Sequence, residues 1–202
     1  MPVDFYTIPC NNPQGNCQTE PIQCLQPIQS NTFGISDVDG GRNLPAKINA
    51  INPDSTTDFI VVNNSNTEVF FKAVDWCVPI FRSGTYDLDD DGRIAAQFSS
   101  DNIGAELIKR CEGFLQFSGS IVFIEIKNRR GGKGWLKDAR EKFEETILSF
   151  KEHHPDLAAQ VVKPRLCNPL FHRVYHQNET VQKRILKDKI GLDFIRQDSI
   201  TI

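Results

Sequence analysis

The stretch from Ile121 to Arg130 reads I-V-F-I-E-I-K-N-R-R, an apolar run that stops at two charged residues. Residues 121–124 carry no polar side chain, which is typical of a strand buried on both faces. Because strand side chains alternate, Glu125 and Lys127 should share one face. A buried charge is unfavourable unless it is paired, so the end of this strand is the first place to look for a functional site.

The rest of the chain predicts a mixed α/β fold, with a central mixed sheet flanked by helices. Glycines 131, 132 and 134 end the strand, and apolar residues then recur at helical spacing from Trp135 to Phe150, which predicts a helix over 135–153. Further strands are predicted at residues 57–64, 68–78, 161–166 and 194–202, and further helices at 102–117 and 179–189. The Asn-rich turn at 63–66 predicts that the first two of these strands form a hairpin.

Composition divides the chain into two parts. Residues 1–56 are rich in Pro, Gln, Asn and Gly and predict an irregular N-terminal arm or small subdomain. Residues 57–202 form the predicted α/β domain, with an insertion at about residues 79–117. No signal peptide or membrane-spanning stretch is visible, so we expect a cytoplasmic location and free thiols at the six cysteines.

The net charge of −3 argues against a generic nucleic-acid coat protein. Acidic residues outnumber basic ones in residues 1–101, however, and the reverse holds in residues 102–202. A basic face on the second half of the chain is therefore compatible with the composition.

A second carboxylate, Asp75, stands near the end of the strand predicted at 68–78. If this strand neighbours the one that carries Glu125, the two carboxylates could hold Mg²⁺ or Mn²⁺ through oxygen ligands. Lys127 would then project beside the ion. A metal flanked by a cation is what phosphodiester hydrolysis requires, because charge develops on the phosphate and on the attacking water.

This arrangement resembles the PD-(D/E)xK nuclease superfamily, through Asp75 in V-D-W-C-V, through F-I-E-I-K and through the helix that follows. The resemblance covers about residues 57–166 and implies a restriction-endonuclease-like fold. It implies that Asp75 and Glu125 bind the metal, that the backbone carbonyl of Ile126 also ligates it, and that Lys127 assists the attacking water. It favours DNA over RNA as the substrate.

The chain departs from the family pattern at several places. The family's aspartate is usually closer in sequence to its glutamate, and Val74 stands where the proline would be. Lys142 lies near the position where many members carry a glutamine. Many members also carry a glutamate on a helix before the first strand; no such helix is predicted here, and Glu68, Glu106 and Glu112 are the candidates for that glutamate.

Basic residues are concentrated from Lys127 onward. Lys133, Lys137 and Arg140 recur at helical spacing and could follow a phosphate backbone. The predicted substrate-binding set is Arg129, Arg130, Lys133, Lys137, Arg140 and Lys142. The commoner meaning of this pattern is a solvated helix face with Glu–Lys pairs.

A second hypothesis, of a different class, is an interaction or immunity-type protein that uses a degenerate nuclease fold to bind a protein partner. The negative net charge and the missing helix-borne glutamate favour it. On either hypothesis, the N-terminal arm is a candidate docking surface for a partner protein or for a second subunit.

Overall fold

The computed structural model describes residues 3–6, 25, 27–37, 45–50, 59–78, 80, 108–127, 134–170 and 176–202. In these ranges the chain forms a mixed α/β structure with two helices and two mixed sheets. Within the same ranges, neither helix combines the length and the apolar character that crossing a membrane requires. The expected cytoplasmic location stays a prediction.

The larger sheet has the strand order β4-β5-β6-β7-β8. Its strands are β4 (Val69–Ala73), β5 (Gly113–Phe117), β6 (Ser120–Ile126), β7 (Arg165–Cys167) and β8 (Ile195–Arg196). The first three strands pair antiparallel, and β7 and β8 then join in parallel. The turn between β5 and β6 contains Ser118 and Gly119, both at positive φ.

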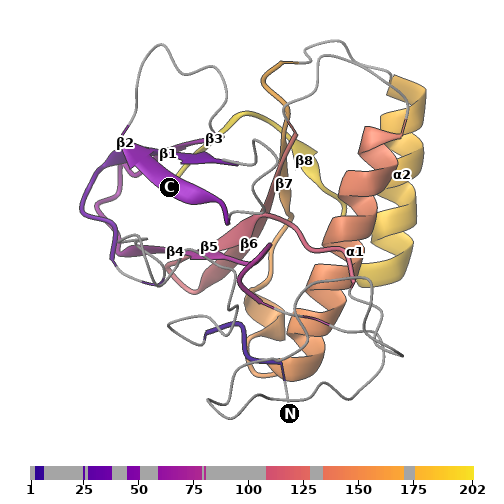
Figure 1. The fold of residues 1–202 in the computed structure, drawn as a ribbon, viewed down its shortest axis with the longest axis horizontal. Helices are drawn as coiled ribbons and strands as arrows, with labels where there is room; N and C mark the ends of the chain where they lie inside the picture. Colours follow the sequence, from indigo (N-terminus) through magenta and orange to yellow (C-terminus); the bar gives the residue numbers. More distant parts are fainter. Residues whose placement is uncertain are drawn as a thin grey trace.

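Two helices supply the parallel crossovers: α1 (Trp135–His153) connects β6 to β7, and α2 (His176–Ile190) connects β7 to β8. They lie side by side and cover one side of the five-stranded sheet (Figure 1). The predicted helix at 135–153 is confirmed, with Phe143, Ile147 and Phe150 fully buried. After α1 comes a short 3-10 turn, Ala158–Gln160. Gly191, at φ 80°, ends α2.

The smaller sheet has the order β2-β1-β3-β9 and lies on the other side of the five-stranded sheet from the helices (Figure 1). It consists of β1 (Thr32–Ser36), β2 (Lys47–Ala50), β3 (Phe59–Val62) and β9 (Ser199–Thr201). This sheet explains why every residue of the run 121–126 is buried, because the strand has a packed layer on each face.

The N-terminal arm contributes two strands to this sheet and is therefore not irregular throughout. Because β9 pairs in parallel with β3, the arm and the last residues of the chain share one sheet. Strands as short as T-F-G-I-S and K-I-N-A contain too few apolar positions for their alternation to be recognised in the sequence. The single strand predicted at 194–202 is in fact two short strands in two sheets.

Two further predictions are wrong. The predicted helix at 102–117 contains strand β5 over Gly113–Phe117, residues 108–112 have no regular structure, and residues 102–107 lie outside the described ranges. The predicted hairpin does not form either, because β3 pairs with β1 and β9 while β4 pairs with β5. The two strands therefore belong to different sheets.

Candidate functional site

Two glutamates face each other where β5 begins and β6 ends. Gly113 is opposite Ile124 in the antiparallel register, so the next pair outward is Glu112 and Glu125. Phe114 and Phe123 form a pair two residues inward and pack against Phe150 of α1. Because side chains alternate, the two glutamates lie on this same helix-covered face of the sheet. The interface between the sheet and α1 is therefore apolar around Phe150 and contains charged groups nearer the start of α1.

Glu125 is fully buried, with an exposed fraction of 0 %. Its Oε1 atom lies 2.6 Å from Nζ of Lys127 and 3.1 Å from Nζ of Lys142. Within the described residues, its Oε2 atom has no hydrogen-bond partner. A buried carboxylate oxygen without a partner is unfavourable and is expected to have a further ligand in the working protein.

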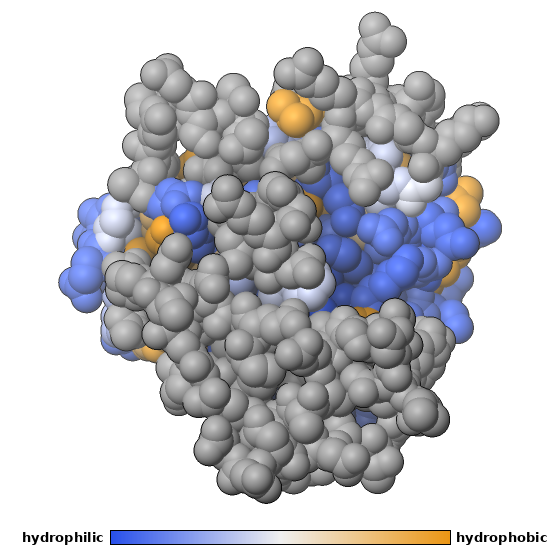
Figure 2. Space-filling model, viewed as in Figure 1, coloured by the Kyte–Doolittle hydropathy of each residue, from blue (hydrophilic) through white to orange (hydrophobic). Residues whose placement is uncertain are grey.

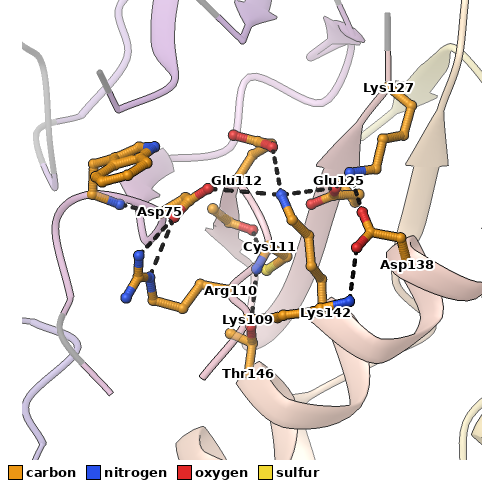
Figure 3. A network of polar contacts seen from close by, with 12 residues as sticks. Asp75, Lys109, Arg110, Cys111, Glu112, Glu125, Lys127, Asp138, Lys142 and Thr146 are labelled. Carbon is orange, nitrogen blue, oxygen red and sulfur yellow. Dashed lines mark hydrogen bonds and ion pairs between the residues drawn. The ribbon is translucent and has the colours of Figure 1, made fainter. Parts of the chain in front are cut away.

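Lys142 extends from α1 into the centre of the site, where its ammonium group lies among three carboxylates (Figure 3). Its Nζ atom is 3.1 Å from Glu125 Oε1, 3.3 Å from Glu112 Oε1 and 3.7 Å from Asp75 Oδ2. We call Asp75, Glu112 and Glu125 the acidic cluster. Burial lowers the pKa of Lys142, but the charges of the acidic cluster outweigh burial and raise it. Lys142 therefore carries its charge.

Asp75 lies in the turn just after β4, the strand predicted at 68–78. The condition that this strand neighbours the one carrying Glu125 is not met, because β5 lies between β4 and β6. Arg110 holds the Asp75 carboxylate, with Nη2 at 3.0 Å and Nε at 3.3 Å from Oδ1. Since Asp75 and Glu125 both contact the Lys142 ammonium, the structure nevertheless brings the two carboxylates into one cluster.

Glu112 is the site residue that sequence analysis misplaced. It is almost completely buried, and burial first, then the charge of Glu125, raises its pKa well above the ordinary value. The sequence signal was present: the acid stands directly before G-F-L-Q-F, a largely apolar segment that is a strand in the structure, just as Glu125 stands near the end of an apolar strand. Because residues 102–117 were assigned to a helix, the similar positions of Glu112 and Glu125 at the ends of neighbouring strands were not recognised.

Gly113 allows β4 to approach β5 closely beside Glu112. A Cβ atom at this position would lie 2.5 Å from the backbone oxygen of Lys72 and 2.7 Å from the ring of Phe71. Such distances are shorter than side-chain carbons tolerate, so only glycine fits. The glycine thereby fixes the spacing of the strands that carry the acidic cluster.

The residues before β5 are attached to α1 by polar contacts. The backbone N–H of Cys111 donates to Thr146 Oγ1 at 2.9 Å, and that of Lys109 donates to Glu145 Oε2 at 2.7 Å. The Lys109 side chain also pairs with two acids of α1. These contacts position Glu112 against the helix. Cys77, Cys111 and Cys167 are buried and form no disulfide among the described residues, as predicted for them.

Lys127 shares a face with Glu125, as predicted, and links it to α1. Its Nζ atom donates to Asp138 Oδ2 at 2.8 Å. Burial lowers the pKa of Lys127, but Glu125 and Asp138 raise it to above its ordinary value, so Lys127 is an ammonium at neutral pH. Burial of Asp138 opposes ionisation, yet its bonds to Lys127 and Lys109 bring its pKa down to about 2. Ile126, which lies between them in sequence, is buried, and alternation puts its side chain on the opposite face of the sheet.

The predicted substrate-binding residues lie in different environments. Lys137 is exposed, with 67 % of its side chain accessible. Arg140 is buried, donates to Gln182 of α2 at 3.1 Å and pairs with Glu141 and Glu144, so it does not form a surface row with Lys137. Arg129, Arg130 and Lys133 are outside the described residues. Lys142, in the acidic cluster, faces carboxylates. Figure 2 shows hydrophilic residues over the helical side.

The donor set of the acidic cluster suits a hard divalent cation, since Mg²⁺ and Mn²⁺ prefer carboxylate oxygens. The Oε2 atom of Glu125, which has no hydrogen-bond partner within the described residues, supports this fit. In the part of the chain that the structure describes, however, no three His, Cys, Asp or Glu side chains converge closely enough to coordinate one ion. The Lys142 ammonium lies between the carboxylates instead.

Comparison of the chain with protein-family models, with curated proteins and with solved structures found no match. The site's own chemistry is therefore the basis for assigning a function.

Proposed function

We propose that this chain is a metal-dependent phosphodiesterase of the PD-(D/E)xK type that acts on DNA with Mg²⁺ or Mn²⁺. The observation that carries the proposal is the buried pair Glu112 and Glu125 on neighbouring strands, with Lys127 on the same face. Two acids and an ammonium at the ends of two neighbouring strands are the groups that phosphodiester hydrolysis needs.

The order of elements supports the family assignment. Three antiparallel strands β4, β5 and β6 are followed by α1 and by the parallel strand β7, over the region where the sequence resembles the family. Glu112 is also much closer in sequence to Glu125 than Asp75 is, which fits the family's spacing better. We infer that Glu112 and Glu125 are the metal ligands, whereas Asp75 is held by Arg110.

Each residue has a distinct role in this proposal. Glu112 and Glu125 would hold the divalent ion, which would supply positive charge at the phosphate and acidify a water molecule. Lys127 is charged at neutral pH, so it acts as a hydrogen-bond donor that orients the water and stabilises negative charge on the phosphate, and not as a base. Asp138 fixes the Lys127 ammonium by a direct hydrogen bond.

The proposal is tested by incubating supercoiled plasmid DNA with the protein and Mn²⁺ or Mg²⁺. Lys127→Ala should abolish cleavage while the far-UV circular dichroism spectrum stays that of the wild type. Lys163→Ala is the matched control, because Lys163 is 53 % exposed and pairs only with Asp193 among the described residues. Cleavage retained by Lys127→Ala contradicts the mechanism, and cleavage of RNA but not DNA contradicts the substrate.

A non-catalytic interaction or immunity-type protein is the second candidate function. The specific observation in its favour is the Lys142 ammonium, because it neutralises the acidic cluster from within the chain. Calorimetric titration with Mn²⁺ distinguishes the two functions. Heat of binding in wild type that is lost in Glu125→Ala supports the nuclease. Absence of binding in both proteins supports the interaction protein, for which the N-terminal arm is the proposed docking surface.

A further inference from the structure

Residues 3–6, which we call the N-terminal segment, pack against the end of α1 through aromatic side chains. Phe5 is fully buried. Its ring lies edge-on to that of Phe150 of α1, with the ring centroids 5.1 Å apart. The ring of Tyr6 lies edge-on to that of Phe114 of β5, at 5.7 Å. The segment therefore contacts a helix and a strand that are both remote from it in sequence.

His154 links this segment to α1 by a hydrogen bond. It is the C-cap residue of α1, and its backbone N–H donates to the carbonyl oxygen of Phe150. The backbone N–H of Phe5 donates to Nε2 of the His154 ring at 3.3 Å. The imidazole lies 5.2 Å from the Tyr6 ring and 5.0 Å from the Phe150 ring, measured between centroids. It thus lies among the aromatic rings of the contact and supplies the acceptor for the Phe5 amide.

The hydrogen bond to Phe5 depends on the protonation state of His154. An imidazole nitrogen accepts a hydrogen bond only when it carries no proton, so the ring must be neutral with its proton on Nδ1. In the imidazolium both nitrogens are donors, and the Phe5 amide would then face another donor. A buried backbone N–H that loses its acceptor is unfavourable. Protonation of His154 therefore opposes docking of the N-terminal segment.

The preceding residue, His153, makes the opposite kind of hydrogen bond. Its Nδ1 atom lies 2.8 Å from the backbone oxygen of Ser149, one turn earlier in α1. A carbonyl oxygen only accepts, so Nδ1 of His153 carries the proton and donates. A second proton at Nε2 leaves this bond intact, and a positive charge at the end of a helix is favourable. Only the second of these two adjacent histidines therefore loses a hydrogen bond when it is protonated.

The surroundings of His154 favour the neutral ring. Burial lowers its pKa and has the largest effect; the carboxylates of Asp4 and Asp156 oppose this, and His153 lowers the pKa further, so that it lies below its ordinary value. The Tyr6 phenol stays neutral, because burial raises its pKa to about 12. Since the pKa of His154 is lower in the docked state than in the released state, docking is favoured above the ordinary histidine pKa. It is lost as the pH falls through the docked-state pKa.

We propose that His154 is a pH-sensitive switch for the N-terminal segment: the neutral ring holds residues 3–6 on α1, and its protonation releases them. Release would uncover the apolar rings of Phe150 and Phe114, which Phe5 and Tyr6 contact in the docked state. Mild acid thereby changes the surface at the end of α1. The inference does not depend on the proposed nuclease function.

The first test uses the full wild-type chain, labelled with ¹⁵N, in nuclear magnetic resonance. The exchange rate of the Phe5 amide, divided by the intrinsic rate at each pH, gives its protection, and the ring protons of both histidines are titrated in parallel. Protection should fall at least about fivefold from pH 7.5 to pH 5.5, since each unit of pKa difference is worth tenfold in the docking equilibrium. The midpoint should coincide with the titration of His154. Constant protection, or a midpoint that follows His153 instead, overturns the proposal.

Two matched variants assign the switch to one histidine. His154→Gln keeps an oxygen that can accept from the Phe5 amide but cannot titrate in this range, so protection of Phe5 should be independent of pH. His153→Gln should respond to pH as wild type does. A pH response that persists in His154→Gln with the wild-type midpoint, or that disappears in His153→Gln, contradicts the proposal. The wild-type titration is decisive even if a variant fails to fold.

Discussion

The strongest energetic consequence of the structure is the coupling between Lys142 and Glu125. Their charged atoms are 3.1 Å apart, the carboxylate is fully buried and the ammonium is largely so. We predict that Lys142→Met, in the absence of divalent ions, destabilises the protein strongly because it leaves buried carboxylates without their shared cation. Glu125→Gln should partly relieve this effect, because it removes one of those charges.

The expected magnitude follows from the burial. Breaking a buried ion pair by removing one partner costs about 3–5 kcal/mol. Lys127 stays beside Glu125 and Arg110 beside Asp75, which places the expected loss for Lys142→Met at the lower end, about 3 kcal/mol. In a chain of 202 residues this corresponds to a fall in Tm of about 10 °C. The coupling energy in the double variant should exceed about 1 kcal/mol.

The assay is urea unfolding followed by far-UV circular dichroism at pH 7 in EDTA, for wild type, both single variants and the double variant. Lys163→Met is the control, since exposed ion pairs contribute less than about 1 kcal/mol. Two results refute the reasoning: a loss for Lys142→Met no larger than that of the control, or losses in the two single variants that simply add in the double variant.

Three further predictions concern neighbouring features. Gly113→Ala should destabilise the chain by about 1–3 kcal/mol in urea unfolding, because the new Cβ would lie 2.5 Å from a backbone oxygen of β4; an unchanged midpoint refutes the close approach. The raised pKa of Glu112 stabilises wild type at low pH, and this contribution is lost as the pH rises from 4.5 through the folded-state pKa. Glu112→Gln does not lose it, so its stability relative to wild type should increase as the pH rises above 4.5. A constant difference in stability between pH 4 and pH 8 contradicts the burial argument. Arg140→Ala should lower stability by about 1–3 kcal/mol because its hydrogen bond to Gln182 is lost. Lys137→Ala should weaken DNA binding in fluorescence anisotropy and leave stability unchanged. The opposite pattern would show that Arg140 contacts DNA and is not a structural residue.

Long periodic segments were predictable from the sequence because their burial pattern is written in consecutive residues. The helix α1 repeats apolar residues over five turns, and β6 is an uninterrupted apolar run before Glu125. Both elements lie where they were predicted. The pairing of Glu125 with Lys127 on one face follows from the alternation of strand side chains alone.

The strand β5 could not be recognised from the local sequence in the same way. Ile108, Cys111 and Leu115 fit helical spacing, while G-F-L-Q-F fits a strand, and local periodicity does not decide between them. Pairing decided it: the distant strand β4 pairs with one edge of β5, and β6, the other half of a hairpin, pairs with the opposite edge. The short strands of the N-terminal arm were likewise set by pairing with β3 and not by their own composition.

By itself, the sequence determined which residues could carry chemistry, since the apolar strand ending in E-I-K and the following helix need only local physics to be recognised. Only the tertiary structure decided which residues meet. It placed β5 between β4 and β6, set Glu112 opposite Glu125 and brought Lys142 from α1 into the acidic cluster. The physical reason is that buried charges must find partners of opposite sign, and those partners come from elements far apart in the chain.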